Sequence, residues 1–269
     1  MRSFKVLSFN MQFGKVWDPL LPDSAPVRLE QTIEELKKHA ADIVLLQEVE
    51  KVLPGGRQAQ PPPNYERILE ALPGYHGFFA YPATDEGELP FGFGQAILSR
   101  EPLGDTQSVD LPAAPVSFEF EGKETAPTKR LLIGAKTRVD GREIQVFNVH
   151  LQAFFMIGAS SNDHPQQRDR VIEHLKVSTL PTLAGGDFNI GPGEYTLACF
   201  EQEGFTTAQK EATTWKRMPF VTDHIFYNAQ LALKGWQLGE TMASDHDVII
   251  AEMAFAAPSK NNDEQGSVL

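Results

Sequence analysis

A buried strand that runs directly into a polar turn restricts the fold of this chain more than any other feature. Residues 180–184 are apolar, and the segment Gly-Gly-Asp-Phe-Asn-Ile (185–190) follows them. The next three residues, Gly-Pro-Gly, cannot continue a strand. Asp187 and Asn189 therefore lie on a turn at a strand end, which is a common place for chemistry. Taken alone, both residues are also ordinary turn formers.

Strand and helix patterns interleave along the chain. Many strand pairs look antiparallel, which favours an α/β layered sandwich over a doubly wound parallel sheet. With no repeat or boundary, we predict one domain over residues 1–256 and a disordered polar tail over 257–269. The expected strands cover residues 4–9, 42–48, 75–81, 94–99, 105–122, 129–149, 180–187, 220–228, 231–238 and 246–255, and the expected helices lie near 30–37, 65–72, 165–178 and 194–203.

Charge and cysteine content limit the partners and the compartment. The net charge of −12 disfavours a sequence-independent nucleic-acid binder, although a nuclease with a local basic patch stays open. Cys199 is the single cysteine, so no intrachain disulfide forms. The first residues lack the apolar segment of a signal peptide, and no apolar run is long enough to span a membrane. We therefore predict a cytoplasmic protein without an obligate protein partner.

Polar residues stand at the ends of several predicted strands. If strands alternate in direction, these residues meet at one edge of the core. They are Asn10, Glu48, His150, Asp187, Asn189, Asp223, Asp245 and His246.

This set of side chains suits the hydrolysis of a phosphoester with a hard cation. Glu48 and Asn10 would form a sparse Mg²⁺ site, because Mg²⁺ prefers oxygen ligands and keeps several waters. Mn²⁺ is an alternative, whereas zinc is disfavoured because no cysteine pair is present.

Two histidines and an amide are candidates for handling protons and charge. His246 can exchange a proton near neutrality if a carboxylate, either Asp223 or Asp245, orients its ring. His150 and Asn189 are neutral donors that could hold phosphate oxygens as charge develops. By strand alternation His224 points to the opposite face, which favours a structural role.

Seven short motifs resemble, in the same order, those of the endonuclease/exonuclease/phosphatase superfamily, over about residues 4–255. The resemblance implies a four-layer α-β-β-α sandwich, with two packed mixed sheets flanked by helices. The motifs are Ser8-Phe9-Asn10, Leu46-Gln47-Glu48-Val49, Gln95-Ala96-Ile97-Leu98-Ser99-Arg100, Asn148-Val149-His150-Leu151, Gly186-Asp187-Phe188-Asn189, Thr222-Asp223-His224-Ile225-Phe226 and Ser244-Asp245-His246.

The resemblance also implies roles for individual residues. Asn10 and Glu48 would bind the metal, and His150 would contact the scissile phosphate. Asp187 and Asn189 would position the attacking water and the phosphate. His246, oriented by a carboxylate, would act as general base or stabilise the transition state, and the choice of Asp187 or His246 as base stays open.

The main interpretation is a Mg²⁺-dependent phosphodiesterase that works by in-line attack of water. A DNA repair nuclease, a sphingomyelinase-like phospholipid phosphodiesterase and a non-catalytic interaction module are the alternatives. Gln12 weakens the apurinic endonuclease branch, where an acidic residue is usual, and His150-Leu151-Gln152-Ala153 resembles the sphingomyelinase motif.

Aromatic and basic residues near the motifs give further hypotheses. Residues 154–157, Phe-Phe-Met-Ile, could form a wall of the substrate cleft or pack on the core, and Phe91 and Phe93 invite the same two interpretations. Arg100, Arg168 and Lys129 are unassigned cations that could lie near the cleft.

Overall fold

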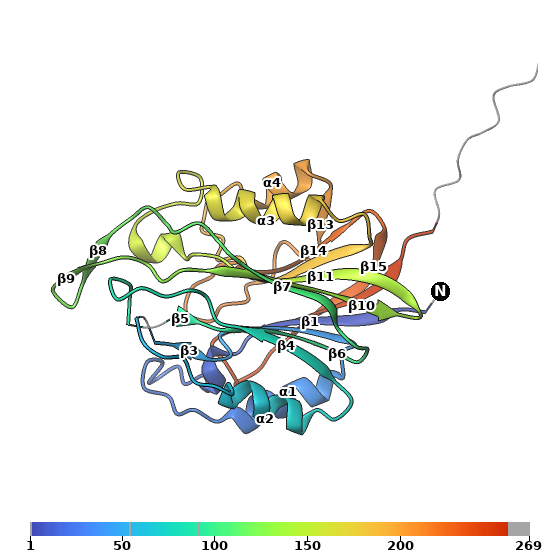
Figure 1. Ribbon diagram of the computed structural model, residues 1–269, viewed down its shortest axis with the longest axis horizontal. Helices are drawn as coiled ribbons and strands as arrows, with labels where there is room; N and C mark the ends of the chain where they lie inside the picture. The colour runs from blue at the N-terminus through green and yellow to red at the C-terminus, as the bar shows by residue number, and fades with distance from the viewer. Residues whose placement is uncertain (1, 54, 91, 258–269) are drawn as a thin grey trace, which may run out of the picture.

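Two six-stranded mixed sheets pack face to face, and a pair of helices covers the outer face of each sheet (Figure 1). The computed structural model describes residues 2–53, 55–90 and 92–257 of the 269-residue chain. The four-layer sandwich expected from the sequence is thereby confirmed. Residues 258–269 of the predicted tail lie outside the described residues.

Neighbouring strands in each sheet often come from distant parts of the chain. The first sheet, in the order β15-β16-β1-β2-β6-β4, contains β1 (Phe4–Asn10), β2 (Ile43–Gln47), β4 (His76–Ala80), β6 (Gln95–Ser99), β15 (Leu231–Gly239) and β16 (Val248–Phe255). The second, in the order β13-β14-β12-β11-β10-β7, contains β7 (Gly104–Asp110), β10 (Leu131–Val139), β11 (Arg142–His150), β12 (Thr182–Asp187), β13 (Phe205–Thr207) and β14 (Asp223–Asn228). Two ribbons pair β3 (Lys51–Val52) with β5 (Gly92–Phe93) and β8 (Phe118–Phe120) with β9 (Lys123–Thr125).

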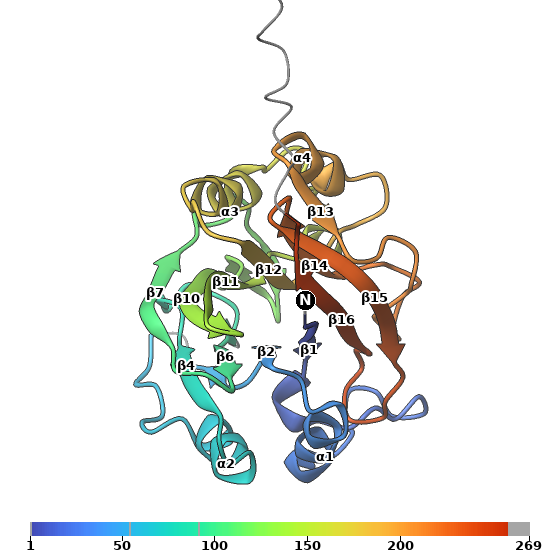
Figure 2. The ribbon, with the colours of Figure 1, turned by 90° about the vertical axis from the view of Figure 1, so that its right-hand side faces the viewer.

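Helices α1 (Leu29–His39) and α2 (Pro63–Ala71) lie below the first sheet, and α3 (Gln166–Lys176) and α4 (Thr196–Gln202) lie above the second (Figure 2). α1 forms because its apolar residues, such as Ile33 and Leu36, recur at helical spacing and become buried. It ends at Ala40, whose left-handed backbone (φ 47°) closes the last turn. None of the helices in the described part of the chain is long and apolar enough to cross a membrane.

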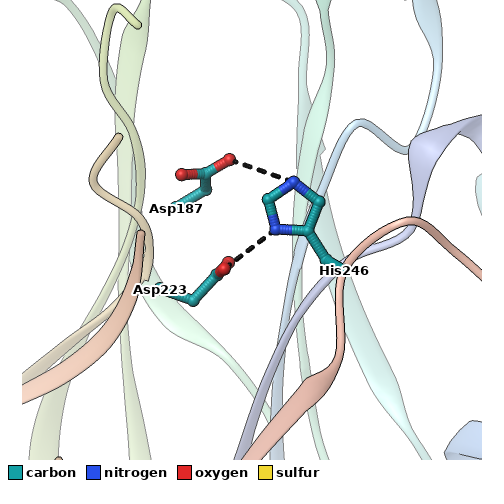
Figure 3. Close-up of side chains that lie close together, drawn as sticks. All are labelled: Asp187, Asp223 and His246. Atoms are coloured by element: carbon teal, nitrogen blue, oxygen red, sulfur yellow. Dashed lines mark hydrogen bonds and ion pairs between the residues drawn. The ribbon is translucent and has the colours of Figure 1, made fainter. Parts of the chain in front are cut away.

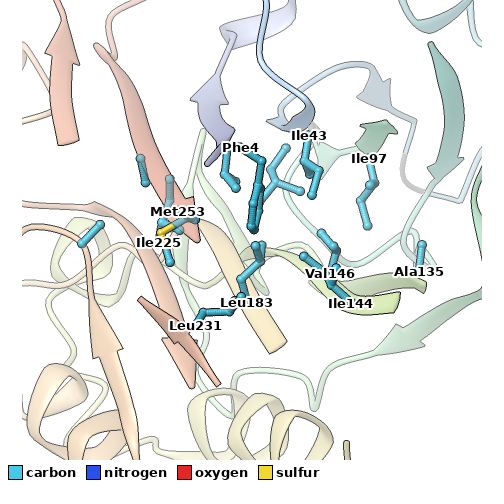
Figure 4. Close-up of a cluster of buried hydrophobic side chains, with 14 of the residues drawn as sticks. Phe4, Ile43, Ile97, Ala135, Ile144, Val146, Leu183, Ile225, Leu231 and Met253 are labelled. Carbon is cyan, nitrogen blue, oxygen red and sulfur yellow. The ribbon is translucent and has the colours of Figure 1, made fainter. Parts of the chain in front are cut away.

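The central core fills the space between the two sheets (Figure 4). Side chains from the inner face of each sheet interdigitate there, for example Val6 and Ile97 from one sheet and Val146 and Leu183 from the other. β2 is buried along its whole length, which is typical of a strand with a continuous run of four apolar residues, 43–46. The helices bury their apolar faces against the outer faces of the sheets in two further clusters.

Several short segments differ from the sequence expectation. The strands expected over 105–122 end at Asp110, because Pro112 and Pro115 cannot join a ladder, and pairing resumes only in the β8–β9 hairpin. Residues 151–164, where the sequence predicts neither a strand nor a helix, contain a short 3₁₀ helix, η2 (Phe154–Ile157), which ends at the left-handed Gly158. A second 3₁₀ turn, η1 (Gln12–Gly14), follows β1.

The directions of the strands determine which strand ends share an edge of the sandwich. β1 and β2 run parallel, as do β11 and β12, while β14 and β16 run antiparallel to their neighbours β12 and β1. The carboxyl ends of the first four strands therefore share one edge of the sandwich with the amino ends of the other two. All the polar strand-end residues expected to meet lie at this edge.

Candidate functional site

Strand register places three of the predicted residues side by side. His150 ends β11 and pairs with Asp187, the last residue of β12. Asp187 also pairs with Asp223, the first residue of β14. Their side chains therefore project from neighbouring strands, and all three residues are buried.

His246 lies between two of these carboxylates (Figure 3). Its Nδ1 atom is 2.8 Å from Asp223 Oδ2, and its Nε2 atom is 3.7 Å from Asp187 Oδ2. Thr222 Oγ1 donates a second hydrogen bond to Asp223 Oδ2 at 2.9 Å. Of the two carboxylates that the sequence offered as partners for His246, Asp223 is the one that holds the ring.

The buried charges shift one another's pKa values. Burial alone would lower the pKa of His246, but Asp223, Asp187 and Asp245 together raise it to about 10. Burial and the charge of Asp223 raise the pKa of Asp187 to about 7. Burial opposes ionisation of Asp223, yet contact with His246 lowers its pKa. At neutral pH the favoured state is an imidazolium held by an ionised Asp223.

Asn10 and Glu48 lie beside this group. Asn10 Nδ2 donates to Glu48 Oε1 at 3.1 Å and to Asp187 Oδ2 at 3.0 Å. Glu48 directly follows β2 and has a left-handed backbone (φ 50°), which turns its side chain at the strand end. Burial and the charge of Asp245 raise the pKa of Glu48 to about 7, so an added cation would stabilise the ionised form.

The donor set fits a hard divalent cation. The carboxylate oxygens of Glu48 and Asp187 both accept from Asn10 Nδ2 and so lie close together, and carboxylate oxygens are a ligand type that Mg²⁺ prefers. The amide oxygen of Asn10, a further oxygen ligand, accepts from the backbone N–H of Gln12 at 3.2 Å. Ligand atoms of Asp187, Asp223 and His246 also lie within 4.8 Å of one another. Since Asp223 and His246 already bind each other directly, the Glu48 side is the better place for a metal.

His150 and Asn189 have different surroundings. His150 Nε2 lies 3.6 Å from Asp187 Oδ2, and its Nδ1 has no hydrogen-bond partner within the described ranges. Burial holds the pKa of His150 well below its usual value, so the ring is neutral. Asn189, left-handed at φ 48°, donates its backbone N–H to Asp187 Oδ1 and its side-chain Nδ2 to the carbonyl of Leu151. Its amide thus also supports the turn.

Asp245 does not hold the His246 ring in this structure. Its Oδ2 atom accepts hydrogen bonds from Gln12 Nε2 at 3.0 Å, Trp215 Nε1 at 3.2 Å and Arg217 Nε at 2.6 Å. The Trp215 ring stacks near His246, with centroids 6.1 Å apart. Asp245 therefore fixes the segment that flanks His246.

Phe154 and Phe155, in the segment 154–157 that could form a wall of the cleft, have different surroundings. Phe154 is buried and stacks on His164, so it belongs to the packing of η2. Phe155 is half-buried and contacts the rings of Trp215 and Phe220, 5.9 and 5.1 Å away between centroids. Of these two phenylalanines, Phe155 is therefore the one that contacts Trp215, the ring beside His246. Phe91 lies outside the described residues, and the Phe93 ring lies 4.9 Å from that of His150.

The cations near the site differ from those named from the sequence. Lys129 pairs with Glu88 at 3.6 Å, Arg168 pairs with Asp169 at 2.9 Å, and Arg100 stacks over Tyr75. Arg130, one position beyond Lys129, is instead buried, and its charge acts on Glu48 and His150. The one sequence signal for the burial of Arg130 is its position directly before the apolar strand β10.

Comparison with protein families agrees with the geometry of the site. The model of the endonuclease/exonuclease/phosphatase family matches residues 7–246, which spans every candidate residue from Asn10 to His246. The chain belongs to this family. Membership in the endonuclease/exonuclease/phosphatase family points to phosphoester hydrolysis. Among curated proteins, no sequence matches this chain significantly.

Solved structures share the fold of the endonuclease/exonuclease/phosphatase family. A family protein from Beutenbergia cavernae has a TM-score of 0.70 at 20% identity, covering 95% of this chain and 72% of that one. A Bacteroides thetaiotaomicron mannosyl-6-phosphatase has a TM-score of 0.67 at 17% identity, covering 94% and 100%. The human nocturnin catalytic domain, solved with a bound sulfate anion, has a TM-score of 0.62 at 18% identity, covering 94% of each chain.

Proposed function

We propose that this chain is a Mg²⁺-dependent phosphodiesterase in which water attacks the phosphorus of a phosphoester. One observation carries the proposal: His246 lies between Asp223 and Asp187, and Asp187 shares Asn10 with Glu48. A proton-handling group and a cluster of oxygen ligands thus meet at one buried point. Family membership supports hydrolysis of a phosphoester in general, and the diester, the metal and the residue roles are part of the proposal.

Asp187 is the group we assign as the base. His246 Nδ1 is engaged by Asp223 and its Nε2 faces Asp187, so the ring is held as a charged donor. Asp187 can take a proton from water at neutral pH, because burial raises its pKa to about 7. The imidazolium of His246 then stabilises negative charge that builds on the phosphate oxygens.

Glu48 and Asn10 would hold the metal, with Mn²⁺ as an alternative to Mg²⁺. When bound, the divalent cation supplies Lewis-acid stabilisation of charge on the phosphate and on the departing oxygen. Asn10 keeps the Glu48 carboxylate oriented through its side-chain amide. The cytoplasmic location inferred from the sequence stays a prediction.

The surroundings of the site favour a small substrate with an apolar or planar group over a long nucleic acid. The net charge of −12 opposes binding of a polyanion, whose affinity depends on neutralising phosphates. The half-buried rings of Phe155, Trp215 and Phe220 offer a surface beside His246 on which such a group can pack. A phospholipid-type or aryl-type diester is therefore the preferred candidate.

Hydrolysis of a panel of substrates tests the proposal. Bis-aryl phosphate, mono-aryl phosphate, nicked DNA, abasic DNA and sphingomyelin are each incubated with Mg²⁺ and with chelator. We expect Mg²⁺-dependent release from a diester and loss of that release with chelator. Activity that is unaffected by chelator, or activity on monoesters alone, would contradict the proposal. Faster cleavage of DNA, falling steeply with salt, would favour a nuclease instead.

A further inference from the structure

Two stacked phenylalanines, Phe13 and Phe93, form an aromatic pair beside His150. The Phe93 ring lies 4.9 Å from the His150 ring, and the Phe13 ring stacks on Phe93 with 5.9 Å between centroids and 14° between planes. On the outer side, Lys51 Nζ lies 5.5 Å from the centroid of the Phe13 ring. Both phenylalanines are half-buried, so each keeps some surface open to a ligand.

The turn that carries Phe13 has a strained backbone. Gln12 (φ 44°) and Phe13 (φ 60°) are consecutive residues in the left-handed region, which bulky side chains seldom adopt. Two main-chain hydrogen bonds fix the turn to the end of β2: the N–H of Met11 donates to the carbonyl of Gln47 at 3.1 Å, and the N–H of Phe13 donates to the carbonyl of Glu48 at 2.8 Å. Strained residues held in this way cluster at sites that bind ligands.

The two histidines of the site approach one carboxylate oxygen from different strands. The Nε2 atoms of His150 and His246 lie 3.6 and 3.7 Å from Asp187 Oδ2. β11, which ends in His150, and β14, whose first residue Asp223 holds His246, flank β12 on its two sides. A phosphate bound at Asp187 would therefore have one histidine in each of two directions.

Each histidine adjoins its own aromatic surface. The aromatic pair contacts His150, whereas the ring of Trp215 stacks with His246 at 6.1 Å and packs against Phe155. The two ester groups of a phosphodiester leave the phosphorus in different directions. A site with two aromatic surfaces thus suits a diester, because a monoester has only one group to place.

We propose that the aromatic pair binds the second ester group of a diester substrate, and that this group is flat and aromatic. The rings of Phe155, Trp215 and Phe220 take the other ester group. The proposal rests on the proposed function, because it takes the scissile phosphate to lie at Asp187. An aryl ring and a nucleobase both stack on phenylalanine, so the shared chemistry is a planar aromatic ester.

Binding of three phosphodiesters tests the proposal without requiring turnover. Calorimetry with Mg²⁺ measures the dissociation constants of dimethyl, methyl phenyl and diphenyl phosphate, and ³¹P NMR checks that each ester stays intact. If two surfaces are present, each phenyl group strengthens binding. With a single surface, the second phenyl group adds at most the twofold gain of a second equivalent orientation.

The variants remove the Phe13 ring or keep it. Phe13→Asn removes the ring and suits the left-handed backbone, which asparagine adopts more readily than phenylalanine does. Phe13→Tyr keeps a flat ring. Trp236→Leu is the control, because it removes a partly exposed ring from the edge strand β15, outside the site.

We expect the affinity of the wild type to rise in two steps. Methyl phenyl phosphate should bind about fivefold or more tighter than dimethyl phosphate, and diphenyl phosphate should bind tighter again by a similar factor. In Phe13→Asn the second step should vanish, so that diphenyl and methyl phenyl phosphate bind within twofold of each other. Phe13→Tyr and Trp236→Leu should keep both steps.

Two results would overturn the proposal: a wild type that binds diphenyl and methyl phenyl phosphate within twofold of each other, or a Phe13→Asn protein that keeps both steps. Phe13→Leu, which keeps the apolar bulk without the flat ring, decides the result by the same criterion if Phe13→Asn fails to fold.

A fourth ligand, phenyl thymidine 5′-phosphate, distinguishes the two sources of a flat ester group. Binding tighter than that of diphenyl phosphate assigns a nucleobase to the aromatic pair, and weaker binding assigns an aryl ring. Either result supports the proposal when the tighter ligand loses affinity in Phe13→Asn, and the absence of that loss would contradict it.

The outcome is separable from that of the proposed function. If no diester is hydrolysed but the second binding step depends on Phe13, the assigned function fails and the aromatic subsite stands. If the wild type hydrolyses a diester with Mg²⁺ and Phe13→Asn keeps both binding steps, the function stands and the role of the aromatic pair fails.

Discussion

At the scale of single residues, the protonation state of His246 decides which group can accept a proton in the site. Its two ring nitrogens face Asp223 at 2.8 Å and Asp187 at 3.7 Å. An imidazole held between two carboxylates keeps its proton, because either charge stabilises the imidazolium. We therefore assign proton acceptance to Asp187 and charge stabilisation to His246.

Replacing Asp223 should release the proton of His246. Asp223→Asn removes the charge that contacts Nδ1, so the pKa of His246 should fall markedly from its raised value. NMR titration of the His246 ring in metal-free protein measures this shift. Asp245→Asn is the comparison, because Asp245 bonds Gln12, Trp215 and Arg217 and should have a smaller effect. An equal or larger shift from Asp245→Asn would contradict the assignment.

His224 should make stability depend on pH. Burial lowers its pKa to about 4, so between pH 4 and 6.5 the unfolded chain binds a proton that the folded chain does not. The free energy of unfolding should therefore fall as pH falls through this window, by about 2 kcal/mol between pH 7 and pH 5 from this residue.

Urea unfolding of wild type and His224→Gln at both pH values isolates the contribution of His224. The stability advantage of the wild type over the variant should shrink by that amount at the lower pH. An advantage that is the same at both pH values would show that His224 does not keep this lowered pKa.

At the scale of elements, strand ends explain which site residues could be predicted from the sequence. Asn10, His150 and Asp187 each end a strand-like segment and Glu48 directly follows one, so a local pattern marks them. Arg130 comes after an irregular segment, where periodicity indicates nothing.

The sequence also could not show which of two aspartates orients the ring of His246. Asp223 and Asp245 each stand at or just before the start of a strand, and both have a histidine next to them. Only the register of β14 against β12 shows that Asp223 faces Asp187 and can reach His246. Side-chain partners of this kind depend on pairing between distant segments, which no local pattern encodes.

The junction of β11 and β12 should tolerate no side chain at Gly186. A Cβ atom there would lie 1.9 Å from the carbonyl oxygen of Val149, and the backbone has a φ of 152°. Gly186→Ala should therefore destabilise the protein by about 3 kcal/mol or more and displace Asp187.

Thermal and urea unfolding of Gly186→Ala measure the loss. Gly104→Ala is the control, because a Cβ on Gly104 meets no described atom within 4 Å and no left-handed φ applies there. Equal stability of the two variants would contradict the close approach of β11 and β12.

At the scale of the whole molecule, the two sheets are joined by a buried polar contact behind the site. Gln47 Nε2 donates to Asn148 Oδ1 at 2.7 Å, and Asn148 Nδ2 donates to the carbonyls of Leu46 and Ala96 at 2.8 Å. The contact links β11 of one sheet to β2 and β6 of the other. It fixes the distance between the ends that carry Glu48 and His150.

Removing this contact should weaken the whole sandwich. Asn148→Ala leaves several buried polar groups without a partner, which should cost about 3 kcal/mol of unfolding free energy. Chemical denaturation measures the cost, and Gln237→Ala on the exposed side of β15 should change stability little. Equal losses for the two variants would show that the buried amide does not join the sheets.

The central claim is that Glu48 and the Asp223–His246–Asp187 group form one phosphodiesterase site. Steady-state hydrolysis of a bis-aryl phosphate with Mg²⁺, compared for wild type, Glu48→Gln and the exposed control Glu34→Gln, tests it most directly. We predict that Glu48→Gln lowers kcat/KM by about 100-fold or more while Glu34→Gln matches wild type. A Glu48→Gln enzyme as active as wild type would contradict the claim.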